Sequence, residues 1–420
     1  MVLLKESVLV IVECCRAVLF FSCLLVCSQG ALGNGAGGKD GAYAEVSQNL
    51  DSATEAAGRA LYEARCAQCH DGNVVRAPQR YILQLSTPEA ILGALNDGLM
   101  QEVASDLSLP QKTAIAEFLT KRKMSGDDVR SAGVACSASA ANFDRAAAPA
   151  FSHWGFDQSG THYIGPSTAS VTKAALPAVE VDWAFAFPSA VRARSQPAVA
   201  GGSIFVGSQS GLVYAFDLET GCTRWQFMAS AEVRNAMIVE PWDPADEEAD
   251  PLLYFGDVSG NQYAISAITG ELRWRKRMDD HGVATLTAAS TLIDEVLYVP
   301  ISSLEEGAAI SADYPCCTFR GAVAALNAGT GEELWRRYFI PPAKEQATND
   351  AGKTLYGPSG VPVWAGMSVD DDLLFVATGD DYTGEGSGAS DSVIALNRHS
   401  GEVVCDAQAR AGDVWNASCE

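Results

Sequence analysis

At 420 residues the chain is too long for one ordinary domain, and two or three folded units are expected. Hydrophobic residues make up 48% of it and charged residues 19%, so there is enough apolar material for a buried core. The formal net charge of -23 argues against binding to nucleic acid or an anionic membrane surface and favours a basic or neutral partner, although acidity also serves solubility alone.

The first thirty residues have the features of an export signal. Lys5 and Arg16 supply positive charge, residues 17–27 form an apolar run, and small residues follow near Gly30. An apolar run of that length is too short to span a bilayer as a helix. We therefore predict a signal peptide over residues 1–30, a mature chain without a transmembrane span, and a periplasmic location. A retained interfacial anchor is the alternative.

A haem-attachment motif follows at Cys66-Ala-Gln-Cys69-His70. Two thiols at this spacing can add to the two vinyl groups of one porphyrin, and the adjacent imidazole then faces the iron. A C-x-x-C pair alone could also be a redox pair or half of a zinc site. The adjacent His, the export signal and an amphipathic helix expected over residues 53–64 favour haem c, with Cys66 and Cys69 as covalent attachments and His70 as an iron ligand.

The second iron ligand is expected on a later loop, and methionine is the usual partner in cytochromes c. Met100 follows a helix expected over residues 88–95, whereas the alternative, Met124, follows a basic helix end. A further helix is expected over residues 109–119. We predict a small all-α cytochrome c domain over residues 45–125 with Met100 as ligand, and a linker over residues 126–150 that Cys136 could tether.

The remainder of the chain repeats one unit. Each copy reads as a strand, a turn closed by Thr-Gly or Ser-Gly, and a second strand ending on Trp, or on Cys in the last copy. The copies begin at Gly211, Gly260, Gly321 and Asp391 and lead to Trp225, Trp274, Trp335 and Cys405. Another apolar strand precedes each copy, so the pattern predicts blades of an all-β propeller over residues 151–420, with the Trp residues packing between blades.

The number of copies sets a further expectation. Four blades are too few to close a ring of this kind around an axial pocket, and a fifth copy begins at Gly412. We therefore expect a propeller of the eight-bladed type that this sequence carries only as far as about its fourth blade.

The haem motif beside the Trp repeats makes the chain resemble the quinohaemoprotein alcohol dehydrogenases that use pyrroloquinoline quinone (PQQ). The order of cytochrome first and propeller second is similar to the polyvinyl alcohol dehydrogenase type. The resemblance runs from residue 55 to the end, and its most telling phrases are Trp183-Ala-Phe-Ala-Phe-Pro, residues 192–197, residues 253–257 and Cys316-Cys-Thr-Phe-Arg-Gly321. It implies PQQ-dependent oxidation of a secondary alcohol, with electrons passing through the haem to an external cytochrome c.

The resemblance also implies a calcium site and quinone contacts. Glu305 follows a loop, Ile301-Ser-Ser-Leu, similar to the family loop that gives a glutamate to calcium, and Ser302 and Ser303 would then touch the quinone. Asp380 stands where the family usually has an asparagine ligand, and a carboxylate is an equally hard donor. Trp364 matches the indole that stacks on the quinone, although ordinary strand packing is its alternative.

Arg194 and Arg234 begin inner strands and could pair with quinone carboxylates, and Thr287 has a comparable position. Two departures stand out. Cys316-Cys317 is similar to the family's vicinal disulfide over the quinone, but in the alcohol dehydrogenases that pair stands one blade earlier.

The second departure concerns the catalytic base. The family's Asp-x-Trp-Asp reads Asp413-Val-Trp-Asn416 here, and a neutral amide cannot take a hydroxyl proton, so Asp413 is the candidate base. The rival interpretation is a haem-bearing electron carrier, or an envelope scaffold, whose propeller binds a partner without any quinone, because binding propellers share the Trp repeats. Calcium-dependent quinone binding would separate the two.

Overall fold

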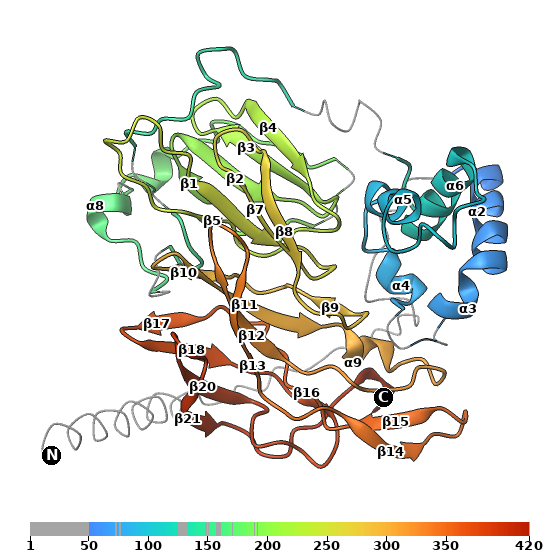
Figure 1. Ribbon diagram of the computed structural model, residues 1–420. Helices are drawn as coiled ribbons and strands as arrows, with labels where there is room; N and C mark the ends of the chain where they lie inside the picture. Colours follow the sequence, from blue (N-terminus) through green and yellow to red (C-terminus); the bar gives the residue numbers. More distant parts are fainter. Residues whose placement is uncertain are drawn as a thin grey trace, which may run out of the picture.

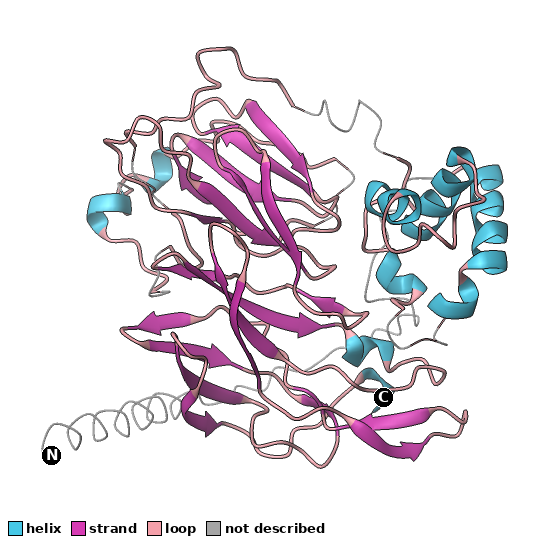
Figure 2. Ribbon diagram, in the orientation of Figure 1, coloured by secondary structure: helices cyan, strands magenta, loops and turns pink. Residues whose placement is uncertain are grey.

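The computed structural model describes residues 50–71, 77–124, 133–147, 151–156, 161–169, 171–188 and 192–419, and the single positions 74, 149 and 190. The expected signal peptide lies outside these residues. Helices α2 to α6 gather in one unit at the side of the molecule, and strands make up the larger part (Figures 1 and 2). Among the described residues, no helix combines the length and the hydropathy that a membrane crossing requires.

The helical unit confirms the helices expected from the sequence. Its elements are α2 (Ser52–Arg65), α3 (Ala67–His70), α4 (Arg80–Leu83), α5 (Pro88–Asn96) and α6 (Leu109–Thr120). The side chain of Asp51 caps α2 by accepting from the Thr54 amide at 2.8 Å, and Thr87 caps α5 ahead of a proline at its first position. These caps satisfy amides that have no partner inside the helix, which fixes where each helix begins.

Helices α2 and α6 cross closely at Gly58. A Cβ at this glycine would lie 2.2 Å from the Ala114 carbonyl oxygen and 2.5 Å from the Phe118 Cβ. The core of the unit forms around this crossing, with Tyr62 and Ile115 fully buried and Phe118 1% exposed. The unit therefore depends on the absence of a side chain at position 58.

Within the described residues, the strands form four larger antiparallel sheets, whose main hydrogen-bonded order follows the chain, and two smaller two-stranded sheets. The first holds β1 (Ala198–Ala200), β2 (Ser203–Gly207), β3 (Leu212–Asp217) and β4 (Thr223–Met228). The second holds β5 (Ile238–Val239), β6 (Leu252–Gly256), β7 (Asn261–Ser266) and β8 (Leu272–Arg277). The third holds β10 (Thr291–Ile293), β11 (Val296–Ser303), β12 (Ala322–Asn327) and β13 (Glu333–Tyr338). The fourth holds β17 (Ser368–Asp370), β18 (Leu373–Ala377), β20 (Ser392–Asn397) and β21 (Val403–Gln408).

Shorter elements surround these sheets. Strand β9 (Ala284–Thr285) pairs with β11, β14 (Lys344–Thr348) with β15 (Thr354–Gly357), and β16 (Ser359–Gly360) with β19 (Asp381–Thr383). The short helices are α8 (Pro166–Ala169), α9 (Glu305–Ala308), η1 (Leu176–Ala178) and η2 (Ala417–Cys419). Helix α9 carries Glu305 and Glu306, and the loop before strand β19 carries Asp380.

The repeated tryptophans join each sheet to the next, as the sequence predicts. The indole Nε1 of Trp225 donates to the Ala267 carbonyl at 3.1 Å, that of Trp274 to Ala328 at 2.8 Å, and that of Trp335 to Arg398 at 3.1 Å. Each ring also lies over the glycine that closes the next sheet's turn. These glycines have positive φ, and their missing side chain leaves room for the ring.

Trp183 repeats this arrangement ahead of the first sheet. Its Nε1 donates to the Leu218 carbonyl at 3.1 Å, and its ring lies over Gly221. Phe185 and Phe187 follow at alternate positions and pack on Tyr214 of the same sheet. Residues 183–187 thus pack on the first sheet in the same way that the last strand of each sheet packs on the sheet that follows it.

The helical unit rests on the propeller through main-chain and apolar contacts. The Thr87 amide donates to the Ser230 carbonyl at 3.0 Å, and Ser86 forms a β-bridge with Ala231. Beside them, Ile82 of α4 packs in one cluster with Val283 and Leu304. This apolar contact lies between α4 and the region of β9 and α9 (Figure 1).

Part of the expected linker is packed on the first sheet. Cys136 forms a disulfide with Cys222, and Ala135 forms a β-bridge with Thr223. Phe143 is 8% exposed and belongs to a hydrophobic cluster that the first two sheets share. Residues 133–147 therefore belong structurally to the sheet they cover.

Candidate functional site

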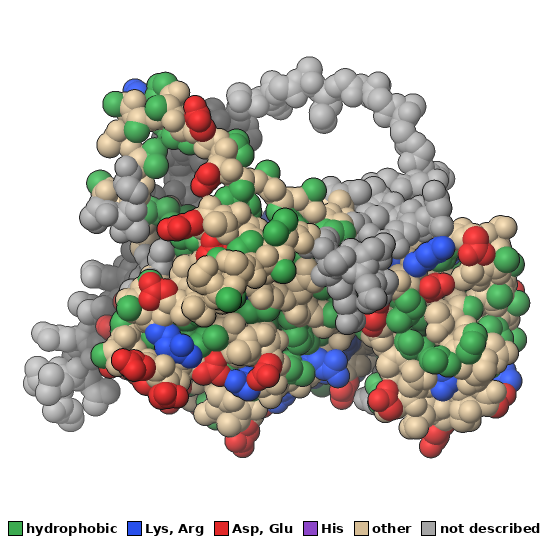
Figure 3. All heavy atoms as spheres, turned by 90° about the horizontal axis from the view of Figure 1, so that it is seen from above, with side chains coloured by type: hydrophobic (Ala, Val, Ile, Leu, Met, Phe, Trp, Pro, Cys, Tyr) green, Lys and Arg blue, Asp and Glu red, His purple; other side chains and the backbone are tan. Residues whose placement is uncertain are grey.

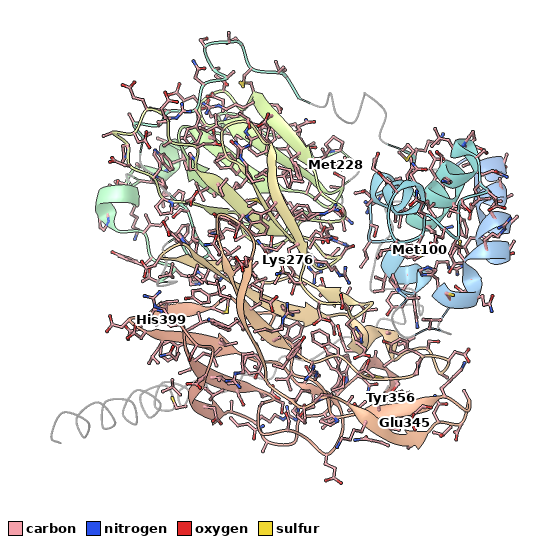
Figure 4. All side chains as sticks on the ribbon, viewed as in Figure 1. Met100, Met228, Lys276, Glu345, Tyr356 and His399 are labelled. Carbon is pink, nitrogen blue, oxygen red and sulfur yellow. A yellow bond between two sulfur atoms is a disulfide. The ribbon has the colours of Figure 1, made fainter. Side chains whose placement is uncertain are left out.

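The residues expected to hold a haem line one apolar cavity. Cys66, Cys69, His70 and Met100 all contribute to this cavity of about 220 Å³ inside the helical unit, and both cysteines are free thiols. Figure 4 marks Met100 on this unit. The cavity brings together two residues thirty positions apart, as an axial ligand pair requires.

The orientation of His70 suits an iron ligand. Its Nδ1 lies 2.7 Å from the Pro78 carbonyl oxygen, and because a carbonyl can only accept, Nδ1 carries the proton. Nε2 is then the unprotonated nitrogen available to a metal. Burial raises the pKa of the Cys66 thiol. Met124, the alternative ligand, does not line the cavity; its amide donates to Glu117.

In the propeller, Glu305 begins α9 and is completely buried. Its Oε1 accepts from the Tyr314 hydroxyl at 2.9 Å and the Thr318 amide at 2.8 Å, and lies 3.3 Å from His281 Nε2. Its Oε2 accepts from the Phe319 amide at 2.8 Å and the Ser359 hydroxyl at 3.2 Å. Burial alone would raise the pKa of Glu305, but His281 and these donors outweigh it and lower the pKa.

Its neighbour Glu306 has the opposite surroundings. Glu306 Oε2 is buried without a hydrogen-bond partner, and so is Asp380 Oδ2 on the loop before β19. Burial raises the pKa of Glu306 to about 7, and the charge of Asp380 adds to that shift. Burial also raises the pKa of Asp380 to about 6, with contributions from Asp391 and Asp413. Each of these two carboxyl groups thus holds a buried, unsatisfied oxygen.

Asp413, the predicted base, lies close to this acidic group. Its carbonyl accepts from the Asp381 amide at 3.2 Å, and its carboxylate lies 3.5 Å from Arg410. Its side chain is 26% exposed, so solvent can exchange protons with it. Asn416 is buried and donates to the Tyr382 carbonyl at 2.7 Å, which gives it a structural contact.

The serine, cysteine and tryptophan candidates surround α9 and β19. Ser303 donates to the Tyr382 hydroxyl at 3.3 Å, and Ser302 is 2% exposed on the same strand. Cys316 and Cys317 form a disulfide within the segment that Glu305 binds. Trp364 is 60% exposed, and its Nε1 lies beside Gly379, directly before Asp380. These residues, except for the largely exposed indole, form one closely packed region.

The remaining three candidates occupy equivalent places in successive sheets. Arg194 precedes Ser195, whose hydroxyl donates to the Asn235 carbonyl at 2.8 Å. Arg234 precedes Asn235, whose side-chain amide donates to the Ala288 carbonyl at 3.3 Å. Thr287 directly precedes Ala288. The three side chains therefore follow one another from sheet to sheet. Arg194 is exposed, whereas Arg234 and Thr287 are half-buried.

Sequence reasoning did not select several residues of this region. They are Glu306, Tyr314, His281 and Tyr382. Only Glu306 had a visible signal, because it directly follows Glu305. The others reach the region from separate loops, which no local spacing could predict.

Comparison with known proteins agrees with the fold. Residues 151–419 match the PQQ family described as "Glucose/ethanol/alcohol dehydrogenase, beta-propeller domain". The chain therefore belongs to this family of PQQ-type β-propeller dehydrogenases.

Two individual relatives are polyvinylalcohol dehydrogenases. The chain is 32% identical over 379 residues to polyvinylalcohol dehydrogenase from Sphingopyxis sp. (strain 113P3), over 86% of this chain and 57% of the relative. It is 32% identical over 381 residues to polyvinylalcohol dehydrogenase from a Pseudomonas species, over 86% and 58%. The chain thus spans less than two thirds of each relative's length. The crystal structure of quinohemoprotein alcohol dehydrogenase from Comamonas testosteroni aligns with a TM-score of 0.47 at 18% identity, over 70% of this chain and 44% of that one.

Proposed function

We propose that this chain provides the haem unit and part of the propeller of a periplasmic quinohaemoprotein dehydrogenase. The enzyme would oxidise a secondary alcohol of the polyvinyl alcohol kind and pass electrons to an external cytochrome c. One observation carries the proposal: a cavity lined by Cys66, Cys69, His70 and Met100 lies in a unit that hydrogen-bonds, through Thr87 and Ser230, to a propeller of the PQQ family. The relatives' names support the substrate class.

The helical unit fits haem c. Cys66 and Cys69 would hold the porphyrin, His70 would present Nε2 to the iron, and Met100 would supply sulfur from across the cavity. The lining is apolar almost throughout, with residues such as Ile91 and Leu95 beside the ligands. Such a lining would exclude water from the iron of a bound haem.

The propeller region fits a calcium ion, with one change in the expected ligands. Asp380 keeps its proposed role, because its Oδ2 is buried and unsatisfied. Glu306 Oε2 is also buried without a hydrogen-bond partner, whereas both oxygens of Glu305 already accept hydrogen bonds from the protein. The described residues hold no ready-made cluster of three or more metal-ligating side chains, so further oxygens would come from the quinone, water or main chain.

When bound, the cation would supply polarisation of a quinone carbonyl, the quinone would supply a hydride acceptor, and the haem would supply a one-electron carrier. The chain's residues would bind and orient. Arg194 and Arg234 would pair with quinone carboxylates, Thr287, Ser302 and Ser303 would donate hydroxyl hydrogen bonds, and Trp364 with Cys316–Cys317 would contact its two faces. Asp413 would accept the alcohol proton and, being partly exposed, release it to solvent.

The test uses exported chain with its haem attached, incubated with PQQ and calcium and then with polyvinyl alcohol or a small secondary alcohol. Haem reduction that needs quinone, calcium and alcohol together supports the proposal. Asp380→Ala should abolish it, whereas Asp246→Ala, on an exposed loop, serves as the matched control. A haem that dithionite reduces but no alcohol reduces, in this chain and in one joined to the remaining length of its Sphingopyxis relative, would contradict the proposal. That result would favour an electron carrier or scaffold that uses no quinone.

A further inference from the structure

Helix α9 opens with two adjacent glutamates in opposite environments. Glu305 is completely buried, and five groups of the protein approach its two oxygens. Glu306 is half-buried and has an oxygen without a partner, near Asp380. Side chains of consecutive residues on a helical turn point in directions about 100° apart, so the two acids cannot serve the same site equally.

We propose that Glu305 is a positioning residue that holds the segment Tyr314–Phe319, and with it the Cys316–Cys317 disulfide, while Glu306 is the acid of α9 that faces the cation. The assignment of Glu306 rests on the proposed function. The assignment of Glu305 rests on its contacts alone.

The segment takes its shape from this carboxylate. The amides of Thr318 and Phe319 directly follow Cys317, and each donates to a different oxygen of Glu305 at 2.8 Å. The Tyr314 hydroxyl approaches from the other side of the disulfide at 2.9 Å. Glu305 therefore binds both ends of a stretch whose two cysteines are 6% and 0% exposed.

Only a carboxylate satisfies both amides. Glutamine has one acceptor oxygen and one donor nitrogen, so in either orientation one backbone N–H of Thr318 or Phe319 would face another donor. Hydroxyls such as those of Tyr314 and Ser359 can rotate and accept, but a backbone amide cannot. A buried amide without an acceptor is costly, so the segment would open locally.

The same geometry argues against Glu305 as a cation ligand. Calcium needs oxygens with lone pairs directed at it from 2.3–2.6 Å. Both Glu305 oxygens already point at polarised N–H and O–H hydrogens, and a cation there would displace them. Glu306 and Asp380 each offer a buried oxygen without that competition.

The experiment measures cysteine reactivity and cation binding on the full chain, without quinone or substrate. Under mild reductant, the rate of alkylation at Cys316 and Cys317 is followed by peptide mass spectrometry, with Cys136–Cys222 as internal reference. Terbium luminescence, excited through tryptophan, reports binding at the cation site. The variants are Glu305→Gln and Glu306→Gln.

We expect Glu305→Gln to speed alkylation of Cys316 and Cys317 at least tenfold relative to the reference pair and to leave terbium affinity within threefold. Glu306→Gln should do the reverse, weakening terbium at least tenfold with unchanged alkylation. Glu305→Asp keeps two acceptor oxygens and should return the alkylation rate to within threefold of the native one. Loss of terbium binding in Glu305→Gln with unchanged alkylation would overturn the proposal.

Two further outcomes also bear on the proposal: a variant that does not fold, and a native chain that binds no terbium. If Glu305→Gln does not fold, Ser359→Ala removes a single donor to the same carboxylate and should speed alkylation a few fold; an unchanged rate would overturn the positioning role. If the native chain binds no terbium, the cation part of the proposed function and the role of Glu306 both fail. The alkylation rates still decide the role of Glu305.

Discussion

The crossing of α2 and α6 provides the sharpest test of the helical unit. In Gly58→Ala the new methyl group would lie 2.2 Å from the Ala114 carbonyl oxygen, which is backbone and cannot rotate away. Separating the helices enough to admit it should cost about 3 kcal/mol, the upper part of the usual range for overpacking. Gly93→Ala in α5 is the matched control, because no atom lies within 4 Å of its Cβ position. That change should stabilise the unit by up to about 1 kcal/mol through helix propensity.

Hydrogen exchange followed by mass spectrometry separates the two variants. At about 1.4 kcal/mol per factor of ten, Gly58→Ala should speed exchange of α2 and α6 peptides by roughly two orders of magnitude. Gly93→Ala should slow it severalfold, and peptides of β2 and β3 should not change in either variant. Unchanged exchange of α2 in Gly58→Ala would refute the reasoning, because it would mean that the helices do not pack at this distance.

Three other changes test separate parts of the chain. Replacing Cys136 and Cys222 together by serine removes a disulfide between residues 86 positions apart. In a denaturant titration, the free energy of unfolding of the first sheet should fall by about 4 kcal/mol. Equal stability of the two proteins would refute the disulfide. Burial raises the pKa of Glu240, so folding is favoured while this group is protonated and stability falls as pH rises from the unfolded value near 4.5 through the raised folded value. Glu240→Gln should therefore be the more stable protein at pH 8 and no more stable at pH 4, whereas a constant difference would contradict the argument. Met100→His should lower the haem midpoint potential in a spectroelectrochemical titration, and Met124→His should not; the reverse pattern would reassign the ligand.

Much of this architecture could be predicted because its determinants are local. The helix near residues 53–64, the Thr-Gly turns and the strands beside them depend on periodicity and on residues such as Gly270 that tolerate the positive φ of a tight turn. The candidate haem residues could also be selected from the sequence, since Cys66, Cys69 and His70 lie close together and Met100 follows a predicted helix. Each of these features is encoded within a few residues.

The acidic region could not be resolved in the same way. Whether Glu305 or Glu306 faces a cation depends on where Thr318 and Phe319 place their amides, and those residues return to α9 only through tertiary structure. The contact of Thr87 with Ser230 had no sequence signal either, because main-chain atoms form it and any residue except proline could supply the amide.

That main-chain contact has an evolutionary consequence. Side chains on the two facing surfaces can be exchanged over many generations without removing the hydrogen bond from Thr87 to Ser230 or the bridge from Ser86 to Ala231. The relative placement of the two units can therefore be inherited more faithfully than the amino acids that form it. Among distant descendants, the separation between the helical unit and the propeller should vary less than their sequences do, and pairwise covariation should be a poor guide to this contact.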